Sequence, residues 1–453
     1  MIRAYPGRAS VLPGERLVLH VATDSARFRV HFYRWHDGFE AMHSSPWQAG
    51  ERARERGAGD DWGWPPYEFP VPAGWRSGVY IAHLEEAEGK RPLSLALASA
   101  AALFVVRGRR HGGMLYKMPL STWHAYNLSG GGCFQRNPPA SSDPPGSRVS
   151  LQRPGGGIGG PAWGAPDHYD TASARHTFAH WDARFIRWLA RQGYTPEFCT
   201  DLDLDADPDL ALRYRLLVAA GNDEYWTAPA RAAVEDFIAA GGNAAWFAAR
   251  LCWWRVHLVD GRFLVCHQGG ARGTCAHDRW WPRHGAGQPE DRLGGVSHRH
   301  GGSWRDGPRQ TGGFIVQQPE HWVFAGTGLR RGGAFGADTW PPLAGYACDG
   351  VPLDTFERTG GRALLSAWAD DDGTPDGYQL LAACPLDCRW QELPARERHA
   401  AGEGVHAATL GLFERGGTVF SAGTSDWAQV LADGRDRTVE RITRNVLDRL
   451  LLH

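Results

Sequence analysis

Hydrophobic and polar residues alternate with a period of two through the first hundred residues of the chain. The segments that carry this alternation, or a short apolar run, are 16–21, 28–33, 78–84 and 102–106. Turn signals such as Pro13-Gly14 lie between them, and no helical pattern interrupts them. Because successive side chains of a strand point to opposite faces of a sheet, the pattern predicts an antiparallel β-sandwich, immunoglobulin-like in size, over residues 1–107.

A helical rhythm replaces this alternation after residue 177. Apolar residues recur at helical spacing from Phe178 to Leu189, and Gly193 marks the end of the predicted helix. The segments that follow are a strand over 197–200, an acidic loop over 201–209, a buried strand over 215–219, a helix from its cap Thr227 to Ala240, and a strand over 243–249. Helices that alternate with strands predict right-handed crossovers and a parallel sheet covered on both faces.

The end of the chain repeats the strand–helix unit, with a strand over 418–422 and a helix over 437–451. We therefore expect residues 108–260 and 414–453 to form two parts of one α/β domain, interrupted by an insertion over 261–413. Within the insertion, residues 261–313 are rich in Gly, Arg, His and Trp and predict a long loop or lid, whereas residues 314–413 contain short strand-like runs.

Composition and charge exclude several classes of protein for this chain. The chain has 453 residues, of which 42% are hydrophobic and 22% charged, and this excludes a disordered or coiled-coil protein. Its 49 Lys and Arg residues balance 50 Asp and Glu residues, so no net field attracts nucleic acid or an anionic membrane. No secretory signal and no apolar segment of about 20 residues is visible, and eight cysteines are too few for a disulfide scaffold. We therefore expect a soluble cytoplasmic protein.

Polar residues gather where a predicted strand ends. In a parallel sheet, ligands bind beyond the carboxyl ends of the strands. The segment Gly221–Trp226 lies there, after the strand over 215–219, and contains two acids, Asp223 and Glu224. These acids can bind a cation or act as a base, or they can simply complement the dipole of the following helix.

A second strand-exit loop, Thr122–Asn127, follows an apparent strand over residues 114–117. Its Tyr126 is a candidate metal ligand or hydrogen-bond donor, although a packed tyrosine with a satisfied hydroxyl is the simpler interpretation. A third candidate segment begins with the glycine-rich Arg153–Gly157 and continues to Tyr169. Its glycines match no nucleotide-binding pattern.

Cysteine and histidine residues offer a different metal site. Four donors lie close together in the sequence at Cys266, His267, Cys275 and His277, enough in principle for tetrahedral zinc, although their spacing matches no standard zinc finger. The chain contains neither a nucleophile elbow nor a zinc-protease signature.

Several segments, taken in their order along the chain, make it resemble one family, the large (beta) subunit of N,N-dimethylformamidase. The resemblance rests on Arg8–Glu15, Trp75–Tyr80, Thr122–Asn127, Val149–Pro154, Gly193-Tyr194, Thr200–Leu204, Asn222–Trp226, Gly345-Tyr346 and Val419–Trp427. Each motif is soft by itself, but their shared order over most of the chain is specific. The resemblance implies a sandwich followed by an α/β domain similar to glutamine-amidotransferase-like proteins.

The resemblance also implies a mononuclear ferric iron, held by two tyrosines and one glutamate, that is used to hydrolyse a small amide. Carried over to this sequence, Glu224 is the carboxylate ligand, Tyr126 is one tyrosine, and Tyr169 is the candidate for the other. Hard phenolate and carboxylate oxygens suit ferric iron, which would act as a Lewis acid or hold a hydroxide. Asp223 is then the candidate that protonates the leaving amine.

Three positions depart from the family pattern. Gly155 stands where relatives often have a tyrosine, and Asn222 stands where the family motif has a histidine, so Asn222 cannot shuttle a proton near neutral pH. Arg250 stands where relatives usually have asparagine, and a fixed cation there favours a carboxylate-bearing or otherwise anionic substrate. We assign Asn222, Asp223 and Arg250 to the catalytic surroundings of the metal.

The sequence therefore predicts an iron-dependent amidohydrolase for a small amide or related C–N bond, other than dimethylformamide itself. Two alternatives stay open: a non-catalytic or altered-activity family member that binds a small ligand in a Trp-rich cleft, and a metal enzyme that uses the Cys/His-rich loop. We expect a small amide as the substrate, and a homo-oligomer or a small companion subunit as the assembly.

Overall fold

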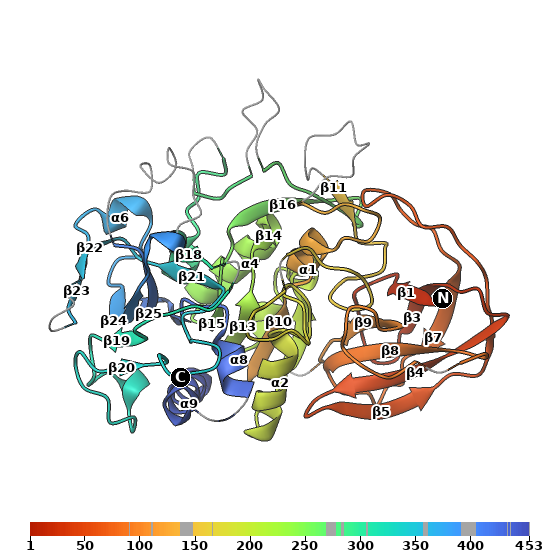
Figure 1. Ribbon diagram of the computed structural model, residues 1–453, viewed down its shortest axis with the longest axis horizontal. Helices are drawn as coiled ribbons and strands as arrows, with labels where there is room; N and C mark the ends of the chain where they lie inside the picture. The colour runs from red at the N-terminus through yellow and green to blue at the C-terminus, as the bar shows by residue number, and fades with distance from the viewer. Residues whose placement is uncertain are drawn as a thin grey trace.

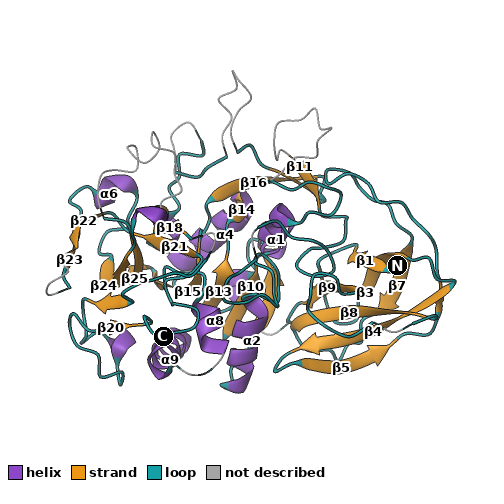
Figure 2. Cartoon of the chain, in the orientation of Figure 1, coloured by secondary structure: helices purple, strands orange, loops and turns teal. Residues whose placement is uncertain are grey.

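A computed structural model of the chain has a β-sandwich on one side and a larger part, built around a central sheet with helices, on the other (Figure 1). It describes residues 1–89, 91–109, 112–135, 148–164, 166–268, 278–281, 285–304, 307–356, 361–390, 405–432, 434 and 436–452. Strands outnumber helices in the described chain, and long loops connect them (Figure 2).

Two sheets form the amino-terminal sandwich. Their strands are β1 (Arg3–Pro6), β2 (Ser10–Val11), β3 (Arg16–Ala22), β4 (Arg27–Trp35), β5 (Phe39–Ser44), β6 (Gln48–Ala49), β7 (Pro66–Pro70), β8 (Gly78–Glu86) and β9 (Ala101–Val106). One sheet has the order β1-β3-β7, and the other has the order β2-β9-β8-β4-β5 with β6 paired to β4. All pairs are antiparallel except that of β2 with β9.

The period-two pattern explains this sandwich. Along β3, Leu17, Leu19 and Val21 are fully buried, whereas Val18 and His20 between them are only half-buried. The buried side chains of β3, β4 and β8 meet in one apolar core. The strands predicted from the alternation are confirmed, and the closer likeness to immunoglobulin domains stays a prediction.

A nine-stranded sheet is the centre of the larger part. Its strands are β10 (Met114–Met118), β12 (Glu197–Thr200), β13 (Leu216–Asn222), β15 (Asn243–Ala249), β19 (Phe314–Val316), β20 (Ala334–Phe335), β24 (Gln379–Pro385), β25 (Ala407–Arg415) and β26 (Gly417–Ser421). Their order is β12-β10-β13-β15-β26-β25-β24-β19-β20. The first five strands in this order are parallel and the later pairs are antiparallel. The predicted parallel sheet is thus one half of a mixed sheet, which strands from the predicted insertion extend.

Helices cover both faces of this sheet. The α-helices are α1 (Leu120–Tyr126), α2 (Asp182–Arg191), α3 (Asp201–Ala206), α4 (Ala228–Ala239), α5 (Asp291–Gly294), α6 (Ala369–Asp372), α8 (Trp427–Ala432) and α9 (Arg437–Leu452), and short 3₁₀ helices span Ala211–Arg213, Trp322–Phe324 and Cys388–Trp390. Along β13, Leu216 and Val218 join the core formed with α2, α8 and α9, whereas Leu217 and Ala219 join the core formed with α3 and α4. Because both faces are covered, the strand is buried at every position and carries apolar side chains from Leu216 to Ala220.

Three smaller sheets complete the architecture. One has the order β11-β17-β16-β14, formed by Arg148–Ser150, Phe263–Val265, Trp254–Val259 and Tyr225–Thr227. The others pair β18 (Ser297–Ser303) with β21 (Ala347–Gly350), and β22 (Leu353–Phe356) with β23 (Ala363–Leu365).

Local structure departs from the sequence-based expectation at three places. Residues 261–313, expected as a long loop or lid, contain β17, α5 and β18 among their described residues. Residues 201–206 form α3 instead of an acidic loop, because Thr200 and Asp203 make a capping box in which each side chain accepts the backbone N–H of the other residue. Residues 122–126 lie in α1 instead of a loop. The predicted cap of α4 is confirmed, since Thr227 Oγ1 accepts the N–H of Ala230.

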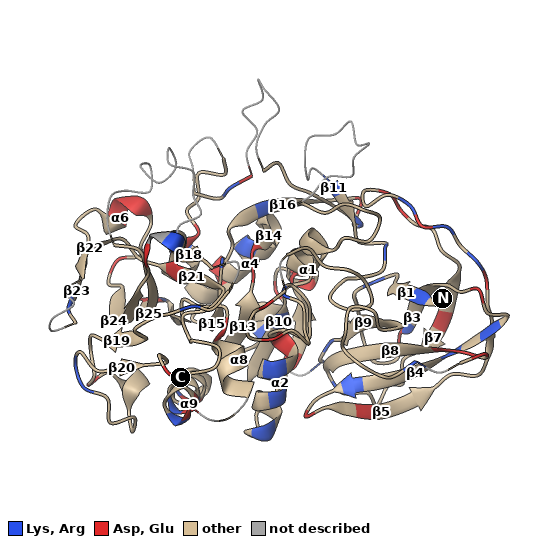
Figure 3. Cartoon of the chain, viewed as in Figure 1, with Lys and Arg blue, Asp and Glu red and all other residues tan. Residues whose placement is uncertain are grey.

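Acidic and basic residues are interspersed over all parts of the chain (Figure 3). On α2, Arg187 and Arg191 pair with Asp37 of the sandwich. Within the described ranges, every helix is too short or too polar to cross a bilayer.

Candidate active site

Three neighbouring parallel strands deliver the candidate residues to one edge of the central sheet. Helix α1 follows β10 and carries Tyr126, Glu224 lies just beyond the end of β13, and Arg250 directly follows β15. The carboxyl ends of adjacent parallel strands face the same side of a sheet, and ligands bind there in α/β proteins. Side chains far apart in the sequence therefore converge at this edge.

Tyr126, Glu224 and Arg250 make direct polar contacts with one another. The Tyr126 hydroxyl donates to Glu224 Oε2 over 2.7 Å, and Arg250 Nη1 donates to the Tyr126 oxygen over 3.1 Å. Arg250 Nη1 also lies 3.5 Å from Glu224 Oε2, within ion-pair distance. The three residues are 3%, 2% and 6% exposed, respectively, so bulk water is largely excluded from these contacts.

Asn222 and His176 extend this group to five residues, which we call the central cluster. Asn222 Nδ2 lies 3.2 Å from Glu224 Oε2 and 3.0 Å from His176 Nδ1. An amide nitrogen can only donate, so His176 Nδ1 accepts and the proton of the neutral ring is on Nε2. The His176 ring stacks on Tyr126 with 3.5 Å between ring centroids. Among the described residues, the donors that reach the Glu224 carboxylate all contact Oε2.

The turn that carries Glu224 is anchored by α1. Thr122 Oγ1 accepts the backbone N–H of Glu224 over 3.0 Å and that of Tyr225 over 3.1 Å. Helix α1 therefore supplies both the Tyr126 phenol and the hydroxyl that positions the carboxylate which this phenol contacts.

Residues from the predicted insertion hold Arg250. The φ angles of Arg250 and His176 are 52° and 60°, in the left-handed region where a non-glycine residue costs roughly 1–3 kcal/mol. Asp349 on β21 accepts the backbone N–H of Arg250 over 2.8 Å and that of Leu251 over 3.1 Å. Ser303 on β18 accepts a hydrogen bond from Arg250 Nη2 over 2.7 Å. The insertion thus completes the site, because it positions both the backbone and the guanidinium of Arg250.

Burial sets the protonation of the central cluster. Burial, reinforced by the Glu224 charge, holds the pKa of the Tyr126 phenol well above its ordinary value. Burial and the Arg250 charge hold the pKa of His176 well below its ordinary value. At neutral pH the phenol keeps its proton and the imidazole is neutral, while Arg250 and Glu224 compensate each other. Because the Arg250 guanidinium already contacts the Glu224 carboxylate, the anionic substrate predicted from Arg250 alone stays a prediction.

Asp223 points away from the central cluster, although it directly precedes Glu224. Its Oδ1 lies 2.7 Å from Lys117 Nζ on β10, and both side chains are completely buried. The Lys117 ammonium lies 4.1 Å from the ring centroid of Trp226. The structure therefore does not bring Asp223 to Tyr126, and the contacts of Asp223 offer no support for a role in protonating an amine.

The two positions considered for a second tyrosine ligand do not supply one to the central cluster. The Tyr169 hydroxyl accepts the N–H of Arg309 over 2.5 Å, and its ring packs edge-on against Trp340. At Gly155 φ is 101°, and a Cβ atom there would lie 2.5 Å from Asn127 Oδ1. A tyrosine side chain therefore cannot extend from position 155 without a local rearrangement.

These observations test whether the residues fit the iron that the resemblance implies. Tyr126 and Glu224 are hard oxygen donors close enough to share a metal ion, but the Arg250 guanidinium already contacts both oxygens. Two positive unit charges about 4 Å apart repel each other by ~4 kcal/mol at a dielectric constant of ~20. With Arg250 in this position, the residues present do not fit an iron ion between Tyr126 and Glu224.

The Cys/His-rich loop contains a separate polar group. Cys275 and His277 lie outside the described residues, whereas Cys266 is buried. In the described ranges, His257, His267 and Asp278 bring one ligand atom each within 4.8 Å of one another, and Arg255 donates to the same carboxylate. Asp278 thus accepts hydrogen bonds from several side chains, and these contacts explain its burial without a metal ion.

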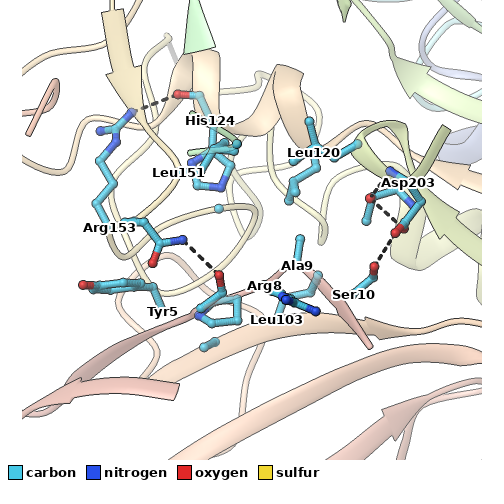
Figure 4. Close-up of a pocket in the computed structure, with 18 of the residues that line it drawn as sticks. Tyr5, Arg8, Ala9, Ser10, Leu103, Leu120, His124, Leu151, Arg153 and Asp203 are labelled. Carbon is cyan, nitrogen blue, oxygen red and sulfur yellow. Dashed lines mark hydrogen bonds between the residues drawn. The ribbon is translucent and has the colours of Figure 1, made fainter. Parts of the chain in front are cut away.

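A cavity of about 360 Å³ lies between the sandwich and the α/β part (Figure 4). Arg8 and Leu103 line it from the sandwich, and Leu120 and His124 line it from α1. Burial lowers the pKa of His124 to about 3, so its ring is neutral. None of the residues of the central cluster lines this cavity, and no tryptophan does either, so it is not the Trp-rich cleft of the alternative hypothesis. Many tryptophans, such as Trp181 and Trp246, are instead core residues.

Sequence reasoning missed several residues of the site. No sequence motif marks His176, Ser303 or Asp349. Ser303 and Asp349 lie on β18 and β21, and the sequence does not indicate that these strands pack beside the carboxyl ends of β13 and β15. Tyr346 had one signal, the Gly345-Tyr346 pair of the family pattern. The Arg250 guanidinium lies 5.4 Å from the Tyr346 ring centroid, so this family motif is part of the site.

The fold and the site define an α/β protein with an added β-sandwich, whose buried phenol, carboxylate and guanidinium meet where such proteins bind small ligands. The sequence profile described as "N,N-dimethylformamidase beta subunit-like, C-terminal" matches residues 27–440. The chain belongs to this N,N-dimethylformamidase beta subunit-like family, which confirms the resemblance. The family is related to a hydrolase, dimethylformamidase.

Two curated relatives agree with this membership. The N,N-dimethylformamidase beta subunit of Paracoccus aminophilus is 25% identical over 305 residues, which cover 60% of this chain and 36% of the relative. The N,N-dimethylformamidase beta subunit of an Alcaligenes species is 24% identical over 302 residues, with the same two coverages. The chain thus spans about a third of the length of the curated relatives it matches.

Proposed function

We propose that this chain is an amidohydrolase that cleaves the C–N bond of a small, neutral amide at the central cluster. The 2.7 Å contact between the Tyr126 hydroxyl and Glu224, from two separate strand ends, is the observation that carries the proposal. Membership of a family related to a hydrolase supports the reaction class. The word "subunit" in the names of the relatives supports a companion subunit for this chain, with a homo-oligomer as the alternative assembly.

In the proposed reaction, the oxygen of a water molecule adds to the amide carbon and the C–N bond breaks, which yields a carboxylic acid and an amine. Glu224 accepts a proton from the water and passes it to the leaving nitrogen. Arg250 donates hydrogen bonds to the amide oxygen while negative charge develops on it. Tyr126 donates its one hydroxyl proton to Glu224 and thereby orients that carboxylate. Asn222 and Thr122 act as positioning residues, because each hydrogen-bonds Glu224 and thereby fixes its orientation.

The surroundings restrict the proposed substrate. Tyr126, Glu224 and Arg250 are almost completely buried, so a large substrate could not reach them without moving the surrounding chain. The paired charges of Glu224 and Arg250 favour an uncharged amide. Iron is left out of the proposed steps, because Arg250 already contacts both candidate ligand oxygens.

Amine release from a panel of small amides tests the proposal. Formamide, acetamide and their N-methyl derivatives are incubated with the wild-type chain and with Glu224→Gln. Removal of a general base lowers turnover by about 10²–10⁴-fold, so we expect a loss of this size in Glu224→Gln. Glu235→Gln is the matched control, because it makes the same chemical change on α4, where Glu235 pairs with Arg231. We expect wild-type rates in this control.

Two results would contradict the proposal. One is the absence of amine release from any amide, with or without a companion subunit. The other is equal turnover in the wild-type chain and Glu224→Gln. Saturable binding of an amide without product release would instead favour the non-catalytic alternative.

A further inference from the structure

The guanidinium of Arg250 occupies the position of a cation shared by Tyr126 and Glu224. Its Nη1 atom lies 3.1 Å from the phenol oxygen and 3.5 Å from Glu224 Oε2. These two oxygens are themselves 2.7 Å apart. One positively charged group thus contacts both atoms that could otherwise share a metal ion.

Contacts from three strands hold the guanidinium there. Arg250 follows β15 in a left-handed conformation, and Asp349 on β21 stabilises that turn by accepting two backbone N–H groups. Ser303 on β18 accepts a hydrogen bond from Nη2, and the Tyr346 ring lies beside the guanidinium. A strained backbone conformation persists only where surrounding contacts stabilise it. The contacts of Arg250 therefore indicate that its guanidinium has a fixed position in the site.

We infer that the Arg250 guanidinium replaces the metal ion, so that the site binds and activates its substrate without iron. The geometry of the cluster carries this inference, and only the identity of the substrate rests on the proposed function. The Arg250 guanidinium lies within ion-pair distance of the Glu224 carboxylate. A ferric ion between Tyr126 and Glu224 would lie close to this guanidinium and be repelled by it.

The replacement changes how the site can act on an amide. A guanidinium polarises an amide oxygen by donating hydrogen bonds from a planar group, whereas it cannot bind and deprotonate a water molecule. The water must therefore lose its proton to a protein group. Glu224 is the carboxylate in contact with Arg250, which makes the two residues a donor–base pair.

Metal binding by the purified chain tests the inference directly. After incubation with Fe³⁺ and dialysis, we expect the wild-type chain to retain iron well below one equivalent and to show no phenolate-to-iron absorption. Arg250→Ala removes the competing cation, and its affinity for iron should rise by at least about tenfold. The accompanying visible absorption should disappear in Arg250→Ala combined with Tyr126→Phe.

Two further variants control this experiment. Arg213→Ala removes a guanidinium from an exposed pair with Asp207, and its iron binding should equal that of the wild-type chain. Arg250→Lys keeps the charge beside Glu224, so we expect a folded chain that, like the wild type, retains iron well below one equivalent. This variant gives a result even if Arg250→Ala does not fold.

Stoichiometric iron in the wild-type chain that is lost in Glu224→Gln would overturn the inference. Equal iron affinity in the wild-type chain and a folded Arg250→Ala variant would overturn it as well. A metal-free wild-type chain that hydrolyses no amide would contradict the proposed function but support the replacement of the metal ion by Arg250. If the chain does hydrolyse an amide, turnover should resist chelators, and free guanidinium should restore part of the turnover lost in Arg250→Ala.

Discussion

Two adjacent acids, Asp223 and Glu224, leave the same strand end but belong to different environments. Asp223 pairs with Lys117 beside the Trp226 ring, in a position completely closed to solvent. Glu224 pairs with Arg250 and also contacts a phenol and an amide. The first pair is surrounded by structural core, and the second by groups that can donate hydrogen bonds to a ligand.

The comparison teaches that neighbouring positions in sequence need not share a role. Asp223 and Glu224 lie between β13 and β14, and their carboxylates contact different partners, Lys117 for Asp223 and Tyr126 with Arg250 for Glu224. Burial raises the pKa of Asp223 although Lys117 acts in the opposite direction. For the Asp223 carboxyl, desolvation thus outweighs the attraction of Lys117, and buried ion pairs of this kind often add little stability by themselves.

Lys117→Met should have the largest effect on stability, because it leaves the Asp223 carboxylate buried without its partner. Loss of one member of a buried ion pair costs about 3–5 kcal/mol. We expect a decrease of this size in the free energy of unfolding, measured by urea denaturation. The double variant Lys117→Met/Asp223→Leu removes both charges and should recover most of the loss. If the double variant is as unstable as Lys117→Met, the description of this pair as replaceable core is wrong.

Thr122→Val should affect the Glu224 side of the comparison. It removes the acceptor of two buried backbone N–H groups and should cost about 2 kcal/mol of unfolding free energy. Because the turn that carries Glu224 loses its anchor, we expect kcat for amide hydrolysis to fall more than KM changes. Thr122→Ser retains the hydroxyl and should restore both stability and kcat. Unchanged kcat in a folded Thr122→Val variant would contradict a positioning role.

A smaller, pH-dependent effect should distinguish Asp223 from an exposed carboxyl. The pKa of Asp223 is raised in the folded protein. At pH values between the ordinary carboxyl pKa and this higher pKa, Asp223 is therefore protonated in the folded chain and ionised in the unfolded chain. The stability of the wild-type chain relative to Asp223→Asn should therefore fall as the pH rises through this interval. Urea denaturation of both proteins at several pH values measures the difference. A rise with pH would mean that attraction by Lys117 dominates.

Much of the fold could be predicted because its signals are local. The alternation in β3 and β4 and the apolar run of β15 each depend on a few consecutive residues. Helix α3 was missed although its capping box, Thr200 to Asp203, has a recognisable spacing. The extension of the sheet by β24 and β25 could not be predicted, since short strand-like runs carry no information about the strands with which they pair.

By itself, the sequence determined the parallel strands of the central sheet, the family, and the strand ends from which Tyr126 and Glu224 arise. Only the tertiary structure decided which acid enters the cluster, that Tyr169 contacts Arg309 instead, and that Arg250 lies against both candidate ligand oxygens. The physical reason is the range of the interactions. Periodicity and capping act over a few residues, whereas the contacts of Arg250 with Tyr126 and Ser303 exist only after distant strands have packed at one edge of the sheet.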